Sequence, residues 1–238
     1  MALKDIKSKI KATERTHKVT RAMEAVSAVK MRKTQGDALA GRPYARAALA
    51  ILARLSGSTE VARHPLAQVR PVERVALVIL TSDKGLAGAL NSAVIKAAAD
   101  AVAAYPVTAV TVYGYGKKGE EYFARRGYRV AMRYENKKDT VELSVMEELG
   151  AALSSGFIAG DYDQVIVAYS NFKSTFEQIP AVRALLPLSL ATVEQLVRDI
   201  VPVKGKWSEL PAIAAPAAYS LEPEDGTVLE YLLPRLVS

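Results

Sequence analysis

Three glycines with the spacing of a dinucleotide-binding loop are the first residues of this chain whose pattern could do chemistry. Gly114, Gly116 and Gly119 form G-x-G-x-x-G between an apolar run and a helical run, and Glu135 follows further along. In a dinucleotide site such glycines bring the backbone close to a pyrophosphate, and an acidic residue binds the ribose. Because the helical run is short and no second domain offers a proton-transfer residue, we interpret the glycines as a structural turn. A dinucleotide-binding oxidoreductase domain is the alternative.

A second glycine-containing segment, residues 81–91, places Ser82, Asp83 and Lys84 after the first apolar run. A serine beside a carboxylate and an amine could be an activated nucleophile. No histidine lies near in sequence, and neither G-K-[ST] nor G-x-S-x-G is present. We therefore expect a tight turn, with Asn91 as the N-cap of the helix that follows.

The composition argues against other kinds of site. The chain has no cysteine, so it can form neither a disulfide nor a thiolate metal site. Its two histidines, His17 and His64, are too few for a multi-histidine metal centre, and His17 is interpreted as a polar residue on a helix face. No apolar run reaches the ~18 residues of a membrane-spanning helix. We expect no cofactor, no metal and no membrane span.

The positive charge is confined to one end of the chain. Residues 1–36 contain ten Lys/Arg and three Asp/Glu, which accounts for the whole net charge of +7. The partner of this segment should therefore be acidic. We do not expect nucleic acid, because the lysines surround the predicted helix and no leucine zipper follows it.

Residues 2–35 contain no proline or glycine and have a helical period. The apolar and small polar residues recur in steps of three and four at Leu3, Ile6, Ile10, Thr13, His17 and Thr20, and a neighbouring stripe continues at Val19, Met23 and Val26. We expect the helix to be interrupted at Gly36 and Gly41. A helix of ~33 residues is about 50 Å long, so burial of its apolar seam requires another helix or a channel in another protein.

From residue 73 onward the pattern is typical of an α/β domain. Apolar runs predict strands at 75–80, 107–113, 128–134, 165–169 and 175–179, and helical runs occupy 91–104, 117–126 and 139–155. The alternation predicts a Rossmann-like, mostly parallel sheet with helices on both faces and an antiparallel edge. Asp139 and Glu142 are read as a capping box. The expected organisation is a stalk segment at 1–58, the α/β domain with an irregular tail at 73–218, and a further helical segment at 219–238.

Several segments resemble, in order, the motifs of F-type ATP synthase gamma subunits. They are Ile6–Ile10, Thr16–Lys33, Arg42–Ala45, Thr81–Asn91, Ser170–Lys173, Gln178–Pro180, Leu185–Pro187, Tyr219–Pro223 and Leu232–Arg235. The resemblance implies a non-catalytic central-stalk rotor that couples proton- or sodium-driven rotation to ATP synthesis. The family's sequences continue past the last motif into a second long helix, so we expect the N-terminal helix to be one half of a coiled coil without its usual mate.

The resemblance also implies the partners. They are the alpha and beta subunits of the catalytic head, the epsilon subunit and the ring of c subunits. Thr20, Met23, Lys30 and Lys33 match the segment that contacts the head, and Tyr219, Glu222 and Pro223 match the foot near the c ring. The location implied is that of a peripheral membrane protein, on the cytoplasmic side of a bacterial inner membrane or the equivalent organelle face.

Overall fold

The chain divides into two units, residues 1–43 and 44–238. The computed structural model describes residues 3–40, 63–136, 141–174, 177–189 and 192. The predictions for Gly41 and the remainder of the stalk segment to residue 58 lie outside these residues. So do those for the irregular tail beyond residue 192 and for the segment 219–238. The first unit holds one long helix, and the second holds an α/β domain.

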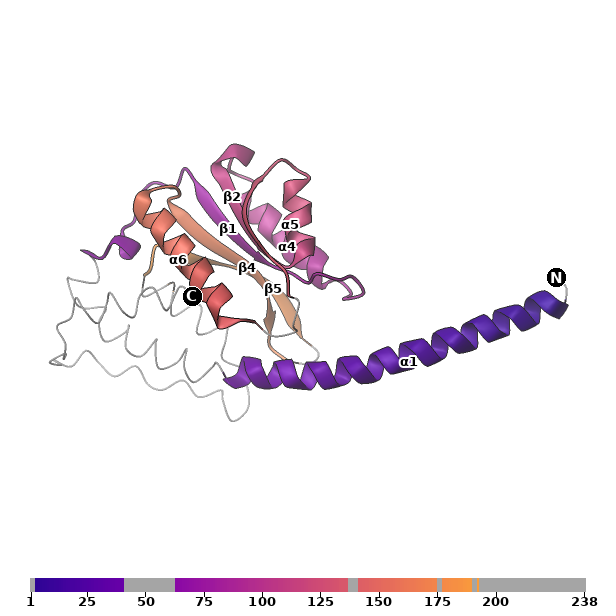
Figure 1. Ribbon diagram of the computed structural model, residues 1–238. Coiled ribbons are helices and arrows are strands. Elements are labelled where there is room, and N and C mark those ends of the chain that lie inside the picture. The colour runs from indigo at the N-terminus through magenta and orange to yellow at the C-terminus, as the bar shows by residue number, and fades with distance from the viewer. Residues whose placement is uncertain (1–2, 41–62, 137–140, 175–176, 190–191, 193–238) are drawn as a thin grey trace. The chain divides into compact units, whose positions relative to one another are not determined.

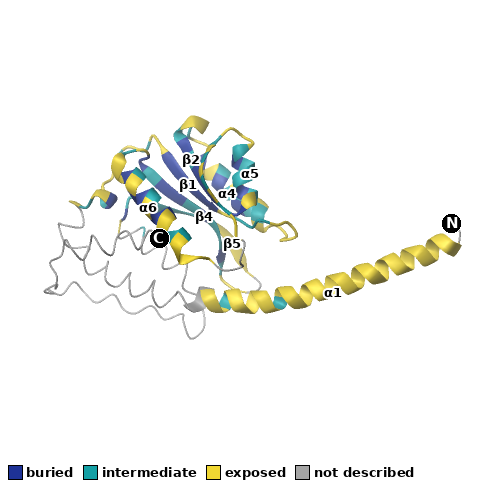
Figure 2. Cartoon of the chain, in the orientation of Figure 1, coloured by how far each residue is buried: buried dark blue, intermediate teal, exposed yellow. Residues whose placement is uncertain are grey.

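The first unit is the helix α1 (Leu3–Ala40), 38 residues in length. At 1.5 Å per residue it is about 57 Å long. From residue 3 to 37 every side chain is exposed except Ala28 and Gln35, which are half-buried (Figure 2). The expectation that Gly36 interrupts this helix was wrong, because one glycine costs only about 1 kcal/mol relative to alanine and the helix continues for another turn.

Five strands form the sheet of the second unit. They are β1 (Val75–Leu80), β2 (Val110–Tyr115), β3 (Arg129–Tyr134), β4 (Gln164–Phe172) and β5 (Gln178–Leu186). Their order is β3-β2-β1-β4-β5; the first four are parallel and β5 is antiparallel to β4. This confirms the mostly parallel sheet with an antiparallel edge. The carboxyl ends of β1, β2 and β3 lie together at one edge of the sheet.

Helices cover both faces of the sheet, as expected (Figure 1). They are α4 (Leu90–Val102), α5 (Lys117–Ala124) and α6 (Leu143–Ala159), with short 3-10 turns at Pro65–Ala67 and Val107–Ala109. Val94 of α4 and Phe123 of α5 belong to the core on one face, and Leu153 and Phe157 of α6 belong to the core on the other. β1 lies between the two cores, so residues 75–79 are all buried.

Three local predictions need correction. Asn91 is not an N-cap, because α4 already begins at Leu90 and the Asn91 side chain is bonded to Ser82 instead. The N-cap of α6 is Glu142 rather than Asp139, and its side chain makes no capping bond. The last strand runs from Gln178 to Leu186, later than the predicted 175–179, because β4 itself extends to Phe172 and the hairpin turn follows it.

Candidate functional site

The three glycines of the dinucleotide-like motif each have a packing reason. Gly116 has φ of +91°, and a Cβ there would lie 1.8 Å from the carbonyl oxygen of Thr81. A Cβ on Gly114 would lie 2.8 Å from Cβ of Glu120, and one on Gly119 would lie 2.9 Å from the side chain of Ile79. The glycines therefore bring β1, β2 and α5 into close contact, which confirms the reading of the motif as a structural turn.

The backbone amides that would face a pyrophosphate are all used inside the protein. Lys117 N–H donates to Oδ1 of Asp83 (3.0 Å), and Lys118 N–H donates to the carbonyl of Ser82 (3.2 Å). Gly119 N–H donates to the hydroxyl of Thr81 (2.8 Å). These are the donors that give a helix N-terminus its affinity for anions. Because each has an internal acceptor, the geometry does not support the dinucleotide alternative.

Backbone and side-chain hydrogen bonds connect the carboxyl ends of β1, β2 and β3. Thr81 N–H donates to the carbonyl of Tyr115 and Gly116 N–H to that of Tyr134, both at 2.8 Å. The second oxygen of Asp83, Oδ2, accepts the N–H of Asn136 at 2.8 Å, just after β3. The ends of β1, β2 and β3 are therefore held as one rigid edge.

Ser82 is held by hydrogen bonds rather than activated as a nucleophile. Its hydroxyl donates to the carbonyl of Lys84 (2.6 Å) and accepts from the amide of Asn91 (2.8 Å), while its N–H donates to Oδ1 of Asn91 (2.9 Å). No hydrogen bond described for Ser82 involves a base. The neighbouring Leu86 has φ of +62° and is 97% exposed, so the Ser82–Asn91 contacts brace a turn that displays an apolar side chain.

Two tyrosines mark the same edge. The rings of Tyr115 and Tyr134 lie 6.4 Å apart at the ends of β2 and β3. Burial raises the pKa of Tyr115 above its ordinary value, and the nearby charge of Asp83 raises it further. Burial likewise raises the pKa of Tyr134, with an added contribution from the charge of Glu148. Both phenols therefore stay protonated near neutral pH and act as polar contacts, not bases.

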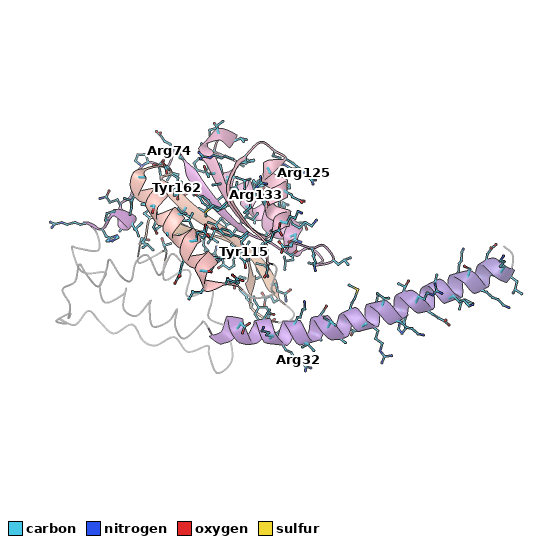
Figure 3. All side chains as sticks on the ribbon, in the orientation of Figure 1. Arg32, Arg74, Tyr115, Arg125, Arg133 and Tyr162 are labelled. Atoms are coloured by element: carbon cyan, nitrogen blue, oxygen red, sulfur yellow. The ribbon has the colours of Figure 1, made fainter. Side chains whose placement is uncertain are left out.

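A cluster of hydrogen bonds that no sequence pattern predicted lies at the opposite edge of the sheet, where β1 and β4 begin. Asp163 is buried and accepts the N–H groups of Glu73 (3.1 Å) and Arg74 (2.9 Å), and the Arg74 guanidinium lies 3.4 Å from Oδ1. Burial alone would raise the pKa of Asp163, but these hydrogen bonds outweigh it and hold the pKa below its usual value. Figure 3 shows Arg74 at this edge, away from Tyr115.

Tyr162 joins α6 to the same edge. Its hydroxyl is shared between the carbonyls of Ala152 (3.0 Å) and Leu153 (2.9 Å), and its ring packs so closely that a Cβ on Gly156 would lie 2.4 Å from the hydroxyl oxygen. Burial raises the pKa of Tyr162 far above its ordinary value. These contacts fix the position of α6 against the start of β4.

The residues predicted to contact the catalytic head all lie on α1. Thr20, Met23, Lys30 and Lys33 are exposed, with Met23 51% exposed. Their steps of three, seven and three keep them within about 140° of the helix circumference at 100° per residue. The Thr20 hydroxyl donates to the carbonyls of Thr16 and His17. The four residues therefore lie on one side of α1, where the apolar side chain of Met23 shares the surface with the basic side chains of Lys30 and Lys33.

The residues predicted for the foot, Tyr219, Glu222 and Pro223, lie outside the described residues. Within the part of the chain that the structure describes, no three His, Cys, Asp or Glu side chains gather as metal ligands would. In the same residues, none of the helices combines the length and apolar character needed to cross a bilayer.

The chain is similar to known proteins along almost its whole length. The family model described as ATP synthase matches residues 2–238. The ATP synthase gamma chain of Pelotomaculum thermopropionicum is 32% identical over 238 residues, which are 99% of this chain and 77% of that one. The gamma chain of Cupriavidus necator is 35% identical over 237 residues, covering 98% of this chain and 77% of the relative.

A solved structure shows the same fold. A chain in the central stalk and c-ring structure of the Tetrahymena thermophila mitochondrial ATP synthase superposes with a TM-score of 0.61 at 20% identity. The match covers 92% of this chain and 87% of the solved one. At this identity the likeness supports the fold alone: a long helix attached to a mostly parallel sheet with helices on both faces.

Proposed function

The chain belongs to the ATP synthase gamma-subunit family, and from this premise we propose that it is the central rotor subunit of an F-type ATP synthase. In this role it couples rotation of an ion-driven ring to the opening and closing of nucleotide sites in the catalytic head. The observation that carries the proposal is the match to gamma chains along residues 2–238, combined with a long helix whose residues 3–37 are exposed except Ala28 and Gln35.

The helix α1 has the physical properties that a shaft needs. It is about 57 Å long, and its apolar side chains are largely exposed, from Leu3 at 70% to Val29 at 68%. Exposed apolar area of this kind is stabilised only by burial against another protein surface. The excess of bases among residues 1–36 favours an acidic surface for that contact.

The α/β domain supports a mechanical role better than a catalytic one. Its glycine motif has no donor left for a pyrophosphate, and Ser82 has no base among its hydrogen-bond partners. What remains is a rigid block with two cores, suited to connect the shaft to its base. We propose that this subunit carries no active site of its own, and that its partners are the alpha, beta and epsilon subunits and the c ring.

The same proposal places the protein at a membrane without crossing it. A gamma-type rotor would sit on the cytoplasmic side of a bacterial inner membrane, or the equivalent organelle face, as a peripheral component. Thr20, Met23, Lys30 and Lys33 of α1 are proposed to contact the head. The Thr20 hydroxyl donates its proton within its own helix, so Thr20 offers a partner its methyl group and an acceptor oxygen.

The experiment that tests the proposal reconstitutes the chain with the other subunits of an F-type ATP synthase, the c ring included, in sealed vesicles and measures assembly, ATP hydrolysis and ion pumping. Met23→Lys adds a base to the head-facing side, where an extra ion pair of ~0–1 kcal/mol would resist rotation. We expect ion pumping per ATP to fall while assembly is unchanged. Ala25→Lys is the matched control, since it places the same charge on an exposed residue about 160° around the helix from Met23.

Two results would count against the rotor role, and a third would count only against the contact at Met23. If the chain does not copurify with alpha and beta subunits, the rotor role fails. If Met23→Lys and Ala25→Lys both couple normally, the contact assigned to Met23 is wrong although the rotor role survives. Micromolar binding of NADH that is abolished by Gly116→Val would restore the enzyme alternative.

A further inference from the structure

The carboxylate of Asp83 stands at the centre of a cradle made by two separate segments. Oδ1 accepts the N–H of Lys117 at the start of α5, and Oδ2 accepts the N–H of Asn136 after β3. Both oxygens of one anion are thus bound by backbone donors that come from different strand ends. A phosphate group in a nucleotide-binding loop is held in the same manner, by amides that converge on its oxygens.

Two further observations connect this cradle to phosphate recognition. Gly114, Gly116 and Gly119 carry the glycine pattern of a dinucleotide loop in its proper context, after a strand and before a helix. The space beside Gly116, which such a loop leaves for the pyrophosphate, is filled by the carbonyl of Thr81, 1.8 Å from where a Cβ would lie. The segment Thr81–Asp83 therefore lies where a ligand would lie in a binding version of the fold.

We propose that Asp83 is a built-in anion that closes this cradle to phosphate groups. The residue determines specificity by exclusion: it keeps a fold of the nucleotide-binding type from binding phosphate groups. Its negative charge is positioned to repel an incoming phosphate, and its oxygens occupy two of the donors that a phosphate would need. The inference rests on the domain's own contacts and is independent of the rotor role.

Basic residues adjoin the segments that form the cradle. Lys84 follows Asp83 in sequence, and Lys117 and Lys118 follow Gly116 at the start of α5. Removal of the carboxylate would leave the two amides without this acceptor and would remove one negative charge from the cradle. Tyr115 also senses the charge, because Asp83 contributes to the raised pKa of its phenol after the larger contribution of burial.

The first test uses the full chain and inorganic phosphate as the probe. Asp83→Ala removes the internal anion, and Asp100→Ala, which changes an exposed residue on α4, alters the net charge equally. Phosphate is titrated at constant ionic strength while the backbone amide resonances of Lys117 and Asn136 are followed by NMR. We expect saturable shifts in Asp83→Ala with an affinity at least about tenfold above wild type, and no gain in Asp100→Ala.

The outcomes separate clearly. Saturable phosphate binding by the wild-type protein at the same affinity overturns the proposal, as does a folded Asp83→Ala protein that gains none. An equal gain in Asp100→Ala would show a general charge effect and would also overturn it.

A second variant covers the case in which Asp83→Ala does not fold. Asp83→Asn keeps the size and one acceptor oxygen but removes the charge. We expect the pKa of Tyr115 to fall toward its ordinary value of 10.0 in this variant, measured from the assigned ring resonances of Tyr115 by NMR, which separate it from the other tyrosines. The Asp100→Asn control should leave that pKa unchanged. A Tyr115 pKa that is the same in Asp83→Asn and wild type would mean that no charged carboxylate occupies the cradle.

Discussion

Asp163→Ala is expected to be among the most destabilising polar substitutions in the α/β domain. The side chain is buried, and its carboxylate is the acceptor for two backbone N–H groups, those of Glu73 and Arg74. Each partly buried donor left without an acceptor costs about 1–2 kcal/mol, at the lower end of the usual range. The loss of the Arg74 contact adds little, since that guanidinium is half exposed. We therefore expect a total loss of about 2–4 kcal/mol.

The assay is urea unfolding followed by the near-ultraviolet circular dichroism of the tyrosines. Asp161→Ala is the matched control, because Asp161 lies two residues away and is exposed; it should cost less than about 0.5 kcal/mol. If both variants lose the same stability, the carboxylate of Asp163 is not the acceptor that holds the starts of β1 and β4 together.

The pH dependence of the same variant has a definite sign. The folded pKa of Asp163 is lowered from the ordinary value of 3.8, so its contribution is fully present at neutral pH and is lost as the pH falls below 3.8 through the lowered pKa. The stability gap between wild type and Asp163→Ala should therefore narrow on acidification. A gap that stays constant down to the acid transition would refute the linkage.

Three further substitutions should change stability: one is expected to lower it and two are expected to raise it. Gly156→Ala should destabilise the domain by about 2 kcal/mol despite the better helix propensity of alanine, because the new Cβ meets the Tyr162 hydroxyl at 2.4 Å; urea unfolding measures it. Gly36→Ala should stabilise the helical state of α1 by up to about 1 kcal/mol, since nothing lies within 4 Å of the added Cβ. The resulting rise in helix content is measured by far-ultraviolet circular dichroism. Leu86→Gly should stabilise the turn by up to about 1 kcal/mol, because φ is +62° and the side chain is 97% exposed; a thermal melt that shows destabilisation would contradict this.

Local sequence patterns predicted the elements well where one segment decides its own structure. The run of apolar residues at 75–80 could only be a strand covered on both faces, and it is β1. Prediction failed where a distant partner decides. Asn91 has the right chemistry for a cap, yet its amide is taken by Ser82 across the turn.

The Asp163 cluster was missed for the same reason. Its acceptor and its donor at Glu73 are separated by 90 residues, and no spacing rule joins them. One signal was present: charged residues precede the first strand, and an aspartate precedes the fourth. Parallel neighbours begin at the same edge of a sheet, so once β1 and β4 are paired, Asp163 and Arg74 must meet there.

The dinucleotide motif shows why a glycine pattern alone does not establish a ligand. Glycines at these spacings report that backbones approach closely, and the structure confirms this at Gly114, Gly116 and Gly119. Whether a ligand enters depends on a different property, the presence of free amide donors at the start of the helix. Here Thr81, Ser82 and Asp83 supply acceptors to those donors from within the chain. The same pattern can therefore serve a nucleotide site or a rigid edge, and the residues after β1 decide between them.

The two units of the chain differ in the burial of their apolar side chains. The α/β domain places its apolar residues in two cores and satisfies the donors of its glycine-rich edge internally. α1 has exposed apolar side chains along its length and threonines such as Thr13 and Thr16 bonded to their own helix. Most of the stability of a protein helix comes from packing of its apolar face rather than from propensity. We therefore expect α1 to be stabilised by the surfaces that cover its apolar side chains in the assembly.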